Sequence, residues 1–254
     1  MTDWNRYREI DALREAGHPA EALVELKTLR ASAADAIDVS SILLGQALAY
    51  RDLGCFNKAV EAALEAVSLL PREHSNRPYA EFVLASAHGD EGRCDLEAEE
   101  LRSILSKYAD FWGEDENIQL RRDAQRRLIA DLIYLGHAIE PLSIINALKT
   151  EEISVGERAE LLYREAQAYR LLDRPDHALE LYQQAASGPL QRSQAARAHF
   201  EIGLVLYDRG KFRQALDEFK TAESLCEPDS PDKDAFAGWV KHTVAAVNKL
   251  PASG

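Results

Sequence analysis

Apolar and polar residues alternate with a helical period along almost the whole chain, and short turns interrupt the period. In the stretch EIGLVLYDRGKFRQALDEF, Glu201–Phe219, an apolar run rich in small residues ends at Asp208–Arg209–Gly210, and a second helical run follows. Apolar residues three or four positions apart share one face of a helix. The stretch therefore predicts two helices joined by a tight turn at Gly210.

The same helix–turn–helix pattern occurs six times. Its turn residues are separated by 37, 38, 44, 37 and 37 positions: Gly17, Gly54, Gly92, Gly136, Asp173 and Gly210. Small residues dominate two columns, seven before the turn (Ile10, Ala47, Ala85, Ile129, Ala166, Gly203) and five after it (Ala22, Ala59, Glu97, Pro141, Ala178, Ala215). Larger apolar residues are frequent nine and twelve positions after it (Leu26, Ala63, Leu101, Ile145, Tyr182, Phe219; Leu29, Ala66, Ile104, Leu148, Ala185, Ala222). Because antiparallel helices approach closely only where side chains are small, each repeat is predicted to be a helical hairpin.

This pattern resembles the tetratricopeptide repeat family. The resemblance covers nearly everything from Trp4 to Pro228, although Glu97 and Pro141 stand where the family prefers alanine. The family's usual repeat is about 34 residues, so a spacing of 37 implies extra residues at helix ends or in turns. The resemblance implies an all-α fold: a right-handed superhelical α-solenoid of antiparallel helix hairpins with about 13 helices.

The spacings also predict the domain organisation. We expect six repeats, a C-terminal capping helix and a tail, at approximately 3–39, 40–77, 78–121, 122–158, 159–195, 196–230, 231–250 and 251–254. The longest spacing surrounds residues 107–116, which indicates a three-plus-three division near 109–121. There, Phe111 and Trp112 either seal the joint between the halves or belong to a functional loop.

Helix boundaries have local signals. Ser154 with Glu157 forms a capping-box pattern and predicts a helix from about Val155. Ser230–Pro231 predicts the start of the last helix, and Pro141 predicts a helix that starts late, near Glu140, without a kink. The last helix carries an apolar stripe, and we expect this stripe to cover the end of the solenoid. The alternative is that Trp239 contacts a second copy of the chain. The stripe consists of Phe236, Trp239, Val240, Thr243, Val244 and Val247.

Composition and charge narrow the classes of partner that the chain is expected to bind. Of the 254 residues 46% are hydrophobic and 7% aromatic, and the formal net charge is −13. Residues 78–121 hold 11 of the acidic and 4 of the basic side chains. Without a Lys/Arg stripe, binding to nucleic acid or an anionic membrane is not expected. The acidic run DEGRCDLEAEE is either a solvated helix face or a surface for a basic partner.

Catalytic chemistry has no signal in the sequence. There is no phosphate-binding, dinucleotide-binding, zinc-protease or nucleophile-elbow motif, and no histidine has a second ligand one helical turn away. A single glycine at the Gly210 turn is too little to cradle phosphate. Cys55, Cys94 and Cys226 are expected to be buried reduced thiols. We expect no cofactor, no metal and no enzymatic activity, and an unrecognised hydrolase or transferase site is the weakest hypothesis.

The family resemblance places candidate binding residues on the first helix of each repeat, which lines the inner groove. Ten and thirteen positions before the turn stand mostly aromatic or apolar residues and two cations: Trp4, Tyr7, Leu44, Tyr79, Phe82, Arg126, Tyr163, Arg197 and Phe200. These side chains either bind an extended peptide or partner helix, or pack between neighbouring repeats. With Arg126 and Arg197 as isolated cations, a clamp for acidic C-terminal tails is not expected.

The leading hypothesis is a cytoplasmic, non-catalytic scaffold, a monomer or weak dimer, that binds a basic or hydrophobic protein segment in its groove. The alternative is a regulatory sensor that binds a small peptide or metabolite and signals to an effector on another chain. The opening residues show no signal peptide and no run reaches the length of a membrane span.

Overall fold

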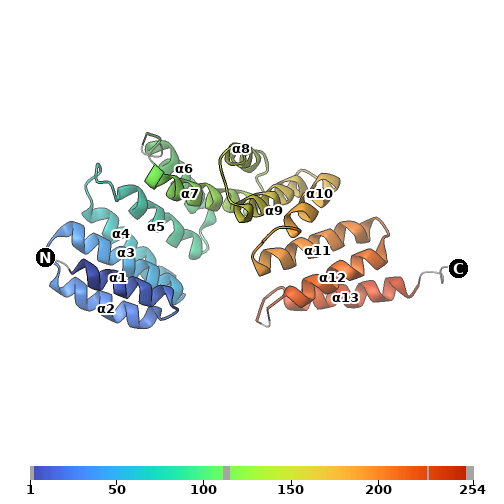
Figure 1. The fold of residues 1–254 in the computed structure, drawn as a ribbon, viewed down its shortest axis with the longest axis horizontal. Helices are drawn as coiled ribbons and strands as arrows, with labels where there is room; N and C mark the ends of the chain where they lie inside the picture. Colours follow the sequence, from blue (N-terminus) through green and yellow to red (C-terminus); the bar gives the residue numbers. More distant parts are fainter. Residues whose placement is uncertain (1–2, 111–114, 228, 250–254) are drawn as a thin grey trace. The chain divides into compact units, whose positions relative to one another are not determined.

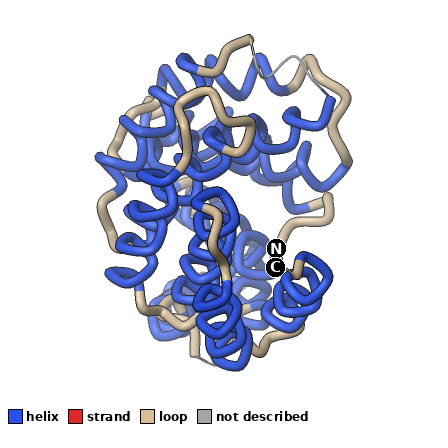
Figure 2. Tube along the Cα trace, turned by 90° about the vertical axis from the view of Figure 1, so that its left-hand side faces the viewer, coloured by secondary structure: helices blue, strands red, loops and turns tan. Residues whose placement is uncertain are grey.

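The computed structural model describes residues 3–110, 115–227 and 229–249, and these form thirteen α-helices and no strand (Figures 1 and 2). The helices are α1 (Trp4–Glu15), α2 (Pro19–Ser32), α3 (Ala36–Asp52), α4 (Phe56–Leu69), α5 (Arg77–Asp90), α6 (Cys94–Lys107), α7 (Asp115–Tyr134), α8 (Ile139–Leu148), α9 (Val155–Leu171), α10 (Pro175–Ala186), α11 (Arg192–Asp208), α12 (Phe212–Leu225) and α13 (Lys233–Val247). The all-α fold is confirmed.

Contacts divide the chain into an N-terminal unit, Met1–Leu135, and a C-terminal unit, Gly136–Gly254. In the N-terminal unit, each helix from α1 to α7 packs on the next one, and α3 also packs on α1 and α5. In the C-terminal unit, α8 packs on α9, α9 and α10 pair, α11 and α12 pair, and α13 covers α12. The division lies later than the 109–121 segment expected from the spacing, because α7 packs on α5 and α6.

The six aligned turn residues share one backbone conformation. Five are glycines with φ between 69° and 93°, and the sixth, Asp173, has φ 55°. They are the residues with positive φ in the described part of the chain. This left-handed conformation ends a helix and is unfavourable for a residue with a Cβ, which is why glycine recurs and an aspartate is the substitute. The alignment on these residues is therefore confirmed.

The four columns of small and apolar residues form the core. Every member of them is buried, from Ile10 in the first repeat to Ala222 in the last. In the sixth repeat, a Cβ added to Gly203 would lie 2.6 Å from the Phe219 ring. The hairpin closes because the largest side chain of α12 faces the smallest residue of α11.

The third repeat solves the same packing problem with a charged residue. Glu97 stands in a small-residue column and is 1% exposed, and it pairs with Arg127 of α7. A Cβ on Gly89 would lie 1.5 Å from the Glu97 carboxylate, so Gly89 provides the space. The acidic run is not a simple solvated face, since Asp90 and Glu100 are paired as well, with Arg51 and His88.

The helix starts agree with the sequence in two of three cases. Both hydrogen bonds of the Ser154–Glu157 capping box form at the start of α9. α8 starts at Ile139, so that Pro141 lies in its first turn. The start at Pro231 is wrong: residues 230–232 form a turn closed by the Lys233 amide on the Ser230 carbonyl at 3.2 Å, and α13 begins at Lys233.

The capping helix covers the last hairpin of the C-terminal unit. Phe236 is 3% exposed, and the Trp239 ring lies 5.4 Å from Phe219 and 5.4 Å from Tyr207. Val244, the fifth member of the predicted stripe, is exposed. Trp239 thus packs on its own chain.

Three further expectations concern the cysteines, the pair Phe111 and Trp112, and membrane-spanning helices. Cys55 is exposed because it lies in the turn before α4, and Cys94 and Cys226 are half-buried, so the expectation of buried thiols is wrong. Phe111 and Trp112 lie outside the described residues. In the described part of the chain, no helix has both the length and the apolar character that a membrane span requires.

Candidate partner-binding surface

Aromatic side chains gather at one end of the N-terminal unit. Trp4 of α1 is 38% exposed and Tyr79 of α5 is 40% exposed. Trp4 meets Tyr7 edge-on at 5.5 Å between ring centroids. Tyr7 is half-buried and donates a hydrogen bond from its hydroxyl to the Ser41 carbonyl of α3 at 3.2 Å. We call the surface formed by these helices the α1–α3–α5 face.

A carboxylate lies near both tyrosines. Burial raises the pKa of Tyr7 and that of Tyr79, and in each case the charge of Asp11 raises it further. Both phenols therefore stay protonated at neutral pH; the Tyr7 hydroxyl donates to Ser41, and that of Tyr79 can donate to a partner. The side chain of Glu15, one turn further along α1, is also exposed. The aromatic end of the face is consequently flanked by negative charge.

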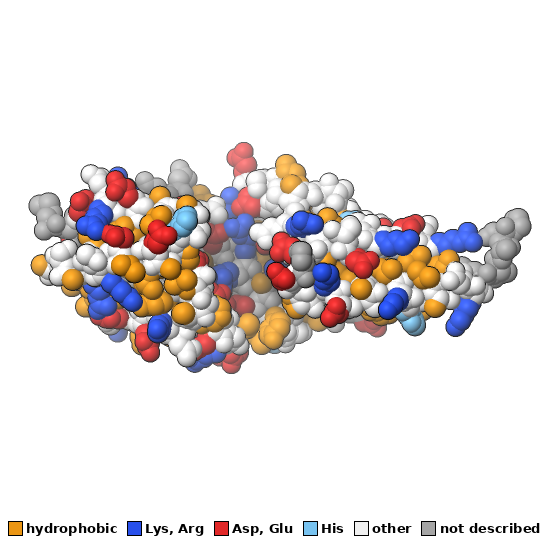
Figure 3. All heavy atoms as spheres, turned by 90° about the horizontal axis from the view of Figure 1, so that it is seen from below, with side chains coloured by type: hydrophobic (Ala, Val, Ile, Leu, Met, Phe, Trp, Pro, Cys, Tyr) orange, Lys and Arg blue, Asp and Glu red, His pale blue; other side chains and the backbone are white. Residues whose placement is uncertain are grey.

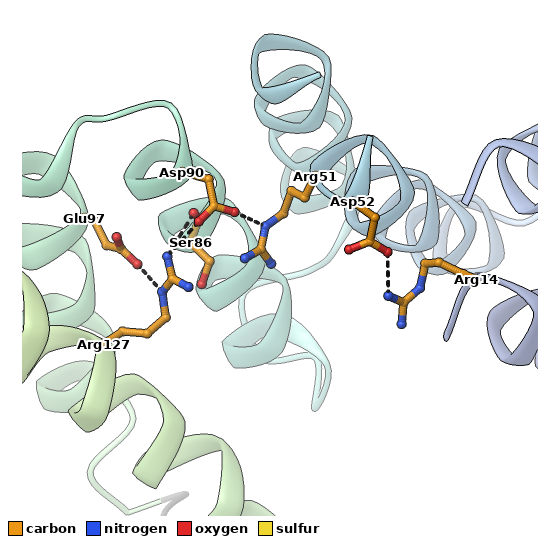
Figure 4. Close-up of polar contacts among 7 residues, drawn as sticks. All are labelled: Arg14, Arg51, Asp52, Ser86, Asp90, Glu97 and Arg127. Carbon is orange, nitrogen blue, oxygen red and sulfur yellow. Dashed lines mark hydrogen bonds and ion pairs between the residues drawn. The ribbon is translucent and has the colours of Figure 1, made fainter. Parts of the chain in front are cut away.

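A row of ion pairs continues the face across the first helices (Figure 4). Arg14 of α1 donates to Asp52 of α3 at 2.9 Å, and Arg51 of α3 donates to Asp90 of α5 at 2.5 Å. Arg127 of α7 donates to the other oxygen of Asp90 at 3.2 Å and to Glu97. Each pair joins one repeat to the next.

These ion pairs determine the net charge that the α1–α3–α5 face presents to a ligand. Arg14 contacts Asp11 at 3.0 Å in addition to Asp52. Burial works against the charge on Arg127, but Glu97 and Asp90 outweigh it and hold its pKa above the ordinary value. Because the guanidinium groups already have carboxylate partners, the face offers little net positive charge to an acidic ligand.

The other candidates of the N-terminal unit are buried, half-buried or paired with a neighbouring side chain. Leu44 is buried, with 5% of its surface exposed, and belongs to the core of the second repeat. Phe82 is half-buried, and Arg126 pairs with Asp123 on its own helix α7.

The candidates of the C-terminal unit are engaged by their own chain. Tyr163 is 3% exposed, its ring lies 5.8 Å from Tyr182, and its hydroxyl accepts a hydrogen bond from Gln167. Phe200 stacks on Phe236 of α13 at 4.6 Å. Arg197 donates to Asp232 at 2.7 Å.

Of the nine candidates, the structure thus brings Trp4, Tyr7 and Tyr79 together on one face and leaves two of them well exposed. The sequence reasoning did not single out Arg14, Arg51, Asp52 and Asp90. Their signal was present: an arginine stands three residues before the turns at Gly17 and Gly54, and an aspartate two residues before the following turn. That the nine residues bind a partner stays a prediction.

Charge is mixed on the side of the molecule that Figure 3 draws, where acidic and basic side chains are interspersed with apolar atoms between them. No three His, Cys, Asp or Glu side chains of the described residues converge to hold a metal ion.

Comparisons with known proteins identify the fold. No family model matches the sequence, and no curated protein is detectably similar to it. Among solved structures, the apo form of the quorum sensor NprR from B. thuringiensis superposes with a TM-score of 0.74 at 12% identity, over 98% of this chain and 71% of that chain.

A tetratricopeptide repeat protein from Parabacteroides merdae superposes with a TM-score of 0.61 at 17% identity, over 94% and 84% of the two chains. A chain of the APC/C hetero-tetramer Cut9–Hcn1 gives 0.66 at 16% identity, over 91% of this chain and 40% of that one. At these identities the likeness establishes the fold alone.

Proposed function

We propose that this chain, a helical-repeat protein with a tetratricopeptide-repeat-like fold, is a non-catalytic module that binds a protein or peptide segment on its α1–α3–α5 face. The observation that carries the proposal is the pair of exposed rings, Trp4 and Tyr79, beside a half-buried Tyr7 and the carboxylate of Asp11. Rigid aromatic side chains with a polar tip are the residues that supply most binding energy in protein interfaces.

Charge selects the partner. Beside the rings, one guanidinium group, that of Arg14, is shared by the carboxylates of Asp11, Glu15 and Asp52, so negative charge is in excess there. Arg51 is neutralised by Asp90. A partner segment with a lysine or arginine next to an apolar or aromatic residue complements this arrangement, whereas an acidic tail does not.

A peptide-display selection tests this specificity. Peptides selected on the wild-type protein should carry Lys or Arg beside an aromatic residue, and Asp11→Asn should remove the preference for the basic residue. Arg14 keeps its bond to Asp52 in that variant. Selection of acidic peptides, or of the same basic peptides by both proteins, would refute the proposed specificity.

A second candidate function is a sensor that binds a small signal molecule and passes its state to another chain. The likeness to the quorum sensor NprR over 98% of the chain favours it. A sensor predicts that a ligand changes the radius of gyration in solution scattering, whereas a simple binding module keeps its radius apart from the added mass of the ligand.

A further inference from the structure

A crevice lies on the opposite side of α3 from the α1–α3–α5 face. Its floor is formed by Gln46 and Tyr50 of α3, and its walls by Arg30 of α2 and by Lys58, Glu61 and Glu65 of α4. Its volume is about 250 Å³. Since a helix turns by about 100° per residue, Gln46 lies about 200° around α3 from Leu44, which shares its column with Tyr7. We call it the Gln46 crevice.

Gln46 is the first unusual feature of this crevice. The residue is 3% exposed, yet its side-chain nitrogen has no hydrogen-bond partner among the residues that the structure describes. A buried polar group without a partner costs roughly 1–3 kcal/mol. A leucine at this position would fill a similar volume without that cost. An amide here is therefore explained best by a partner outside the chain.

The second feature is a lysine of the crevice lining, Lys58, which lies by the ring of Tyr50 as Lys27 does. The ammonium groups of Lys27, on α2, and Lys58, on α4, lie 5.5 and 5.8 Å from the centroid of the Tyr50 ring. Neither lysine has an ion-pair partner in the described part of the chain. A lysine gains only about 0.5–1 kcal/mol from an exposed ring face. An anionic group in the crevice would give Lys58 a stronger, charge-assisted contact.

The third feature is the carboxylate of Glu61, in the wall that α4 forms. Arg30 pairs with Glu65 and so links α2 to α4. Glu61, one turn before Glu65, lines the crevice and has no ion pair among the described residues. The crevice thus presents one unpaired cation, Lys58, an unpaired carboxylate and a buried amide within one small volume.

We infer that the Gln46 crevice binds a free α-amino acid. The ligand carboxylate lies by Lys58, its ammonium group by Glu61, and one of its oxygens accepts a hydrogen bond from the Gln46 amide. A volume of about 250 Å³ suits such a molecule, since pockets for drug-sized ligands span roughly 300–1,000 Å³. Phosphate fits less well because Glu61 and Glu65 repel a second negative charge. The inference does not depend on partner binding at the α1–α3–α5 face.

Titrations followed by ¹H–¹⁵N NMR test the assignment. The probes are the twenty amino acids, first as a mixture and then singly, with sodium acetate and inorganic phosphate as separate arms. At least one amino acid should shift the Gln46 side-chain amide and the backbone amides around Tyr50 and Lys58, and saturate. Lys58→Gln and Glu61→Gln should each weaken this binding about tenfold or more, as expected for the loss of one charge-assisted contact.

Two variants complete the design. Gln46→Leu should abolish the response and raise the melting temperature of the free protein, and Lys220→Gln, at an exposed position of α12, should change neither. The inference is overturned if no amino acid shifts these resonances, if acetate or phosphate shifts them equally at the same concentration, or if Lys58→Gln and Glu61→Gln leave the affinity unchanged.

Discussion

Gly203 and Phe219 occupy neighbouring volumes at the centre of the sixth hairpin. A methyl group on Gly203 would lie 2.6 Å from the Phe219 ring, and overpacking of a core usually costs about 1–3 kcal/mol. Gly203→Ala should therefore lower the free energy of unfolding by that amount, measured by urea denaturation.

Gly238→Ala is the matched control for Gly203→Ala. Gly238 is also helical, but nothing lies within 4 Å of a Cβ placed there. Helix propensity predicts that this variant is up to about 1 kcal/mol more stable than the wild type. Equal stability of the two variants would show that the Gly203–Phe219 contact does not limit the packing.

Gly89 and Glu97 should behave as a coupled pair. Gly89→Ala alone places a methyl group on the Glu97 carboxylate. Glu97→Ala alone removes a carboxylate that pairs with Arg127. In the double variant Glu97→Ala creates the room that the new methyl group needs, so a double-mutant cycle should give a coupling of about 1 kcal/mol or more. Additive effects would contradict the packing described for the third repeat.

At the residue scale, the sequence predicts where the turn and core residues of each repeat stand better than it predicts which side chains are exposed. All six turn residues and all four core columns could be aligned because each depends on a local requirement, a left-handed turn or a close helix approach. Tyr163 and Phe200 share a column with Tyr7, but Tyr163 packs on Tyr182 and Phe200 is stacked by α13. Whether a side chain of this column is exposed depends on the helices that pack against it, and the column itself carries no information about those helices.

Among the elements, α4, α5 and α6 are joined by one polar cluster. Arg77 of α5 donates to the carbonyls of Val67 and Leu70 at the end of α4, at 2.8 and 2.6 Å, and to Glu81 at 2.7 Å. Lys107 of α6 donates to Glu81 at 2.7 Å. The cluster thus provides a charged donor to the Leu70 carbonyl and a second donor to the Val67 carbonyl, which also accepts from the Leu70 amide.

Glu81 makes this cluster sensitive to pH. Burial works against its charged form, but the hydrogen bonds from Lys107 and Arg77 outweigh it and lower its pKa. A pKa that is lower in the folded state contributes stability above the unfolded value of about 4.5, and this contribution is lost as the pH falls through the folded value. Glu81→Gln should cost about 1–2 kcal/mol at pH 7 and progressively less below pH 4.5.

Urea denaturation at pH 7, 5.5 and 4 measures this difference. Glu99→Gln, at an exposed position of α6, serves as the control and should change stability little at any of the three values. A cost for Glu81→Gln that stays constant from pH 7 to pH 4 would show that the ionised carboxylate is not what joins the three helices.

The capping helix contributes through one buried ring. Phe236 is 3% exposed and stacks on Phe200, whereas Val244 on the same helix is 37% exposed. Phe236→Ala should cost about 3–5 kcal/mol, and Val244→Ala should stay within about 0.5 kcal/mol of the wild type. Thermal melts followed by circular dichroism distinguish them. Similar melting temperatures would mean that α13 does not cap the last hairpin.

Helix ends could be predicted where a side chain contacts the adjacent backbone. The capping box at Ser154 is of this kind, and the start of α8 could be predicted because Pro141 is tolerated only in the first turn of a helix. The start of α13 could not be predicted, because residues 230–232 are compatible both with a helix start at the proline and with a turn, and the turn is what forms.

For the whole molecule, the repeat pattern predicts the fold but not the grouping of its repeats. The division between Leu135 and Gly136 depends on which neighbours α7 contacts, and repeat spacing carries no such information. The ion-pair row from Arg14 to Arg127 joins repeats of the N-terminal unit, and its spacing is recognisable only once the first helices are known to lie side by side.

The central claim is that the α1–α3–α5 face binds a partner segment through its exposed rings. Trp4→Ala combined with Tyr79→Ala should weaken binding of the best display-selected peptide at least tenfold, measured by isothermal titration calorimetry. Val24→Ala combined with Leu64→Ala, on α2 and α4, removes side chains that are 63% and 57% exposed and is the control. We expect loss of affinity in the first pair only, with melting temperatures near that of the wild type in both. Equal affinity of the Trp4/Tyr79 variant and the wild type would contradict it.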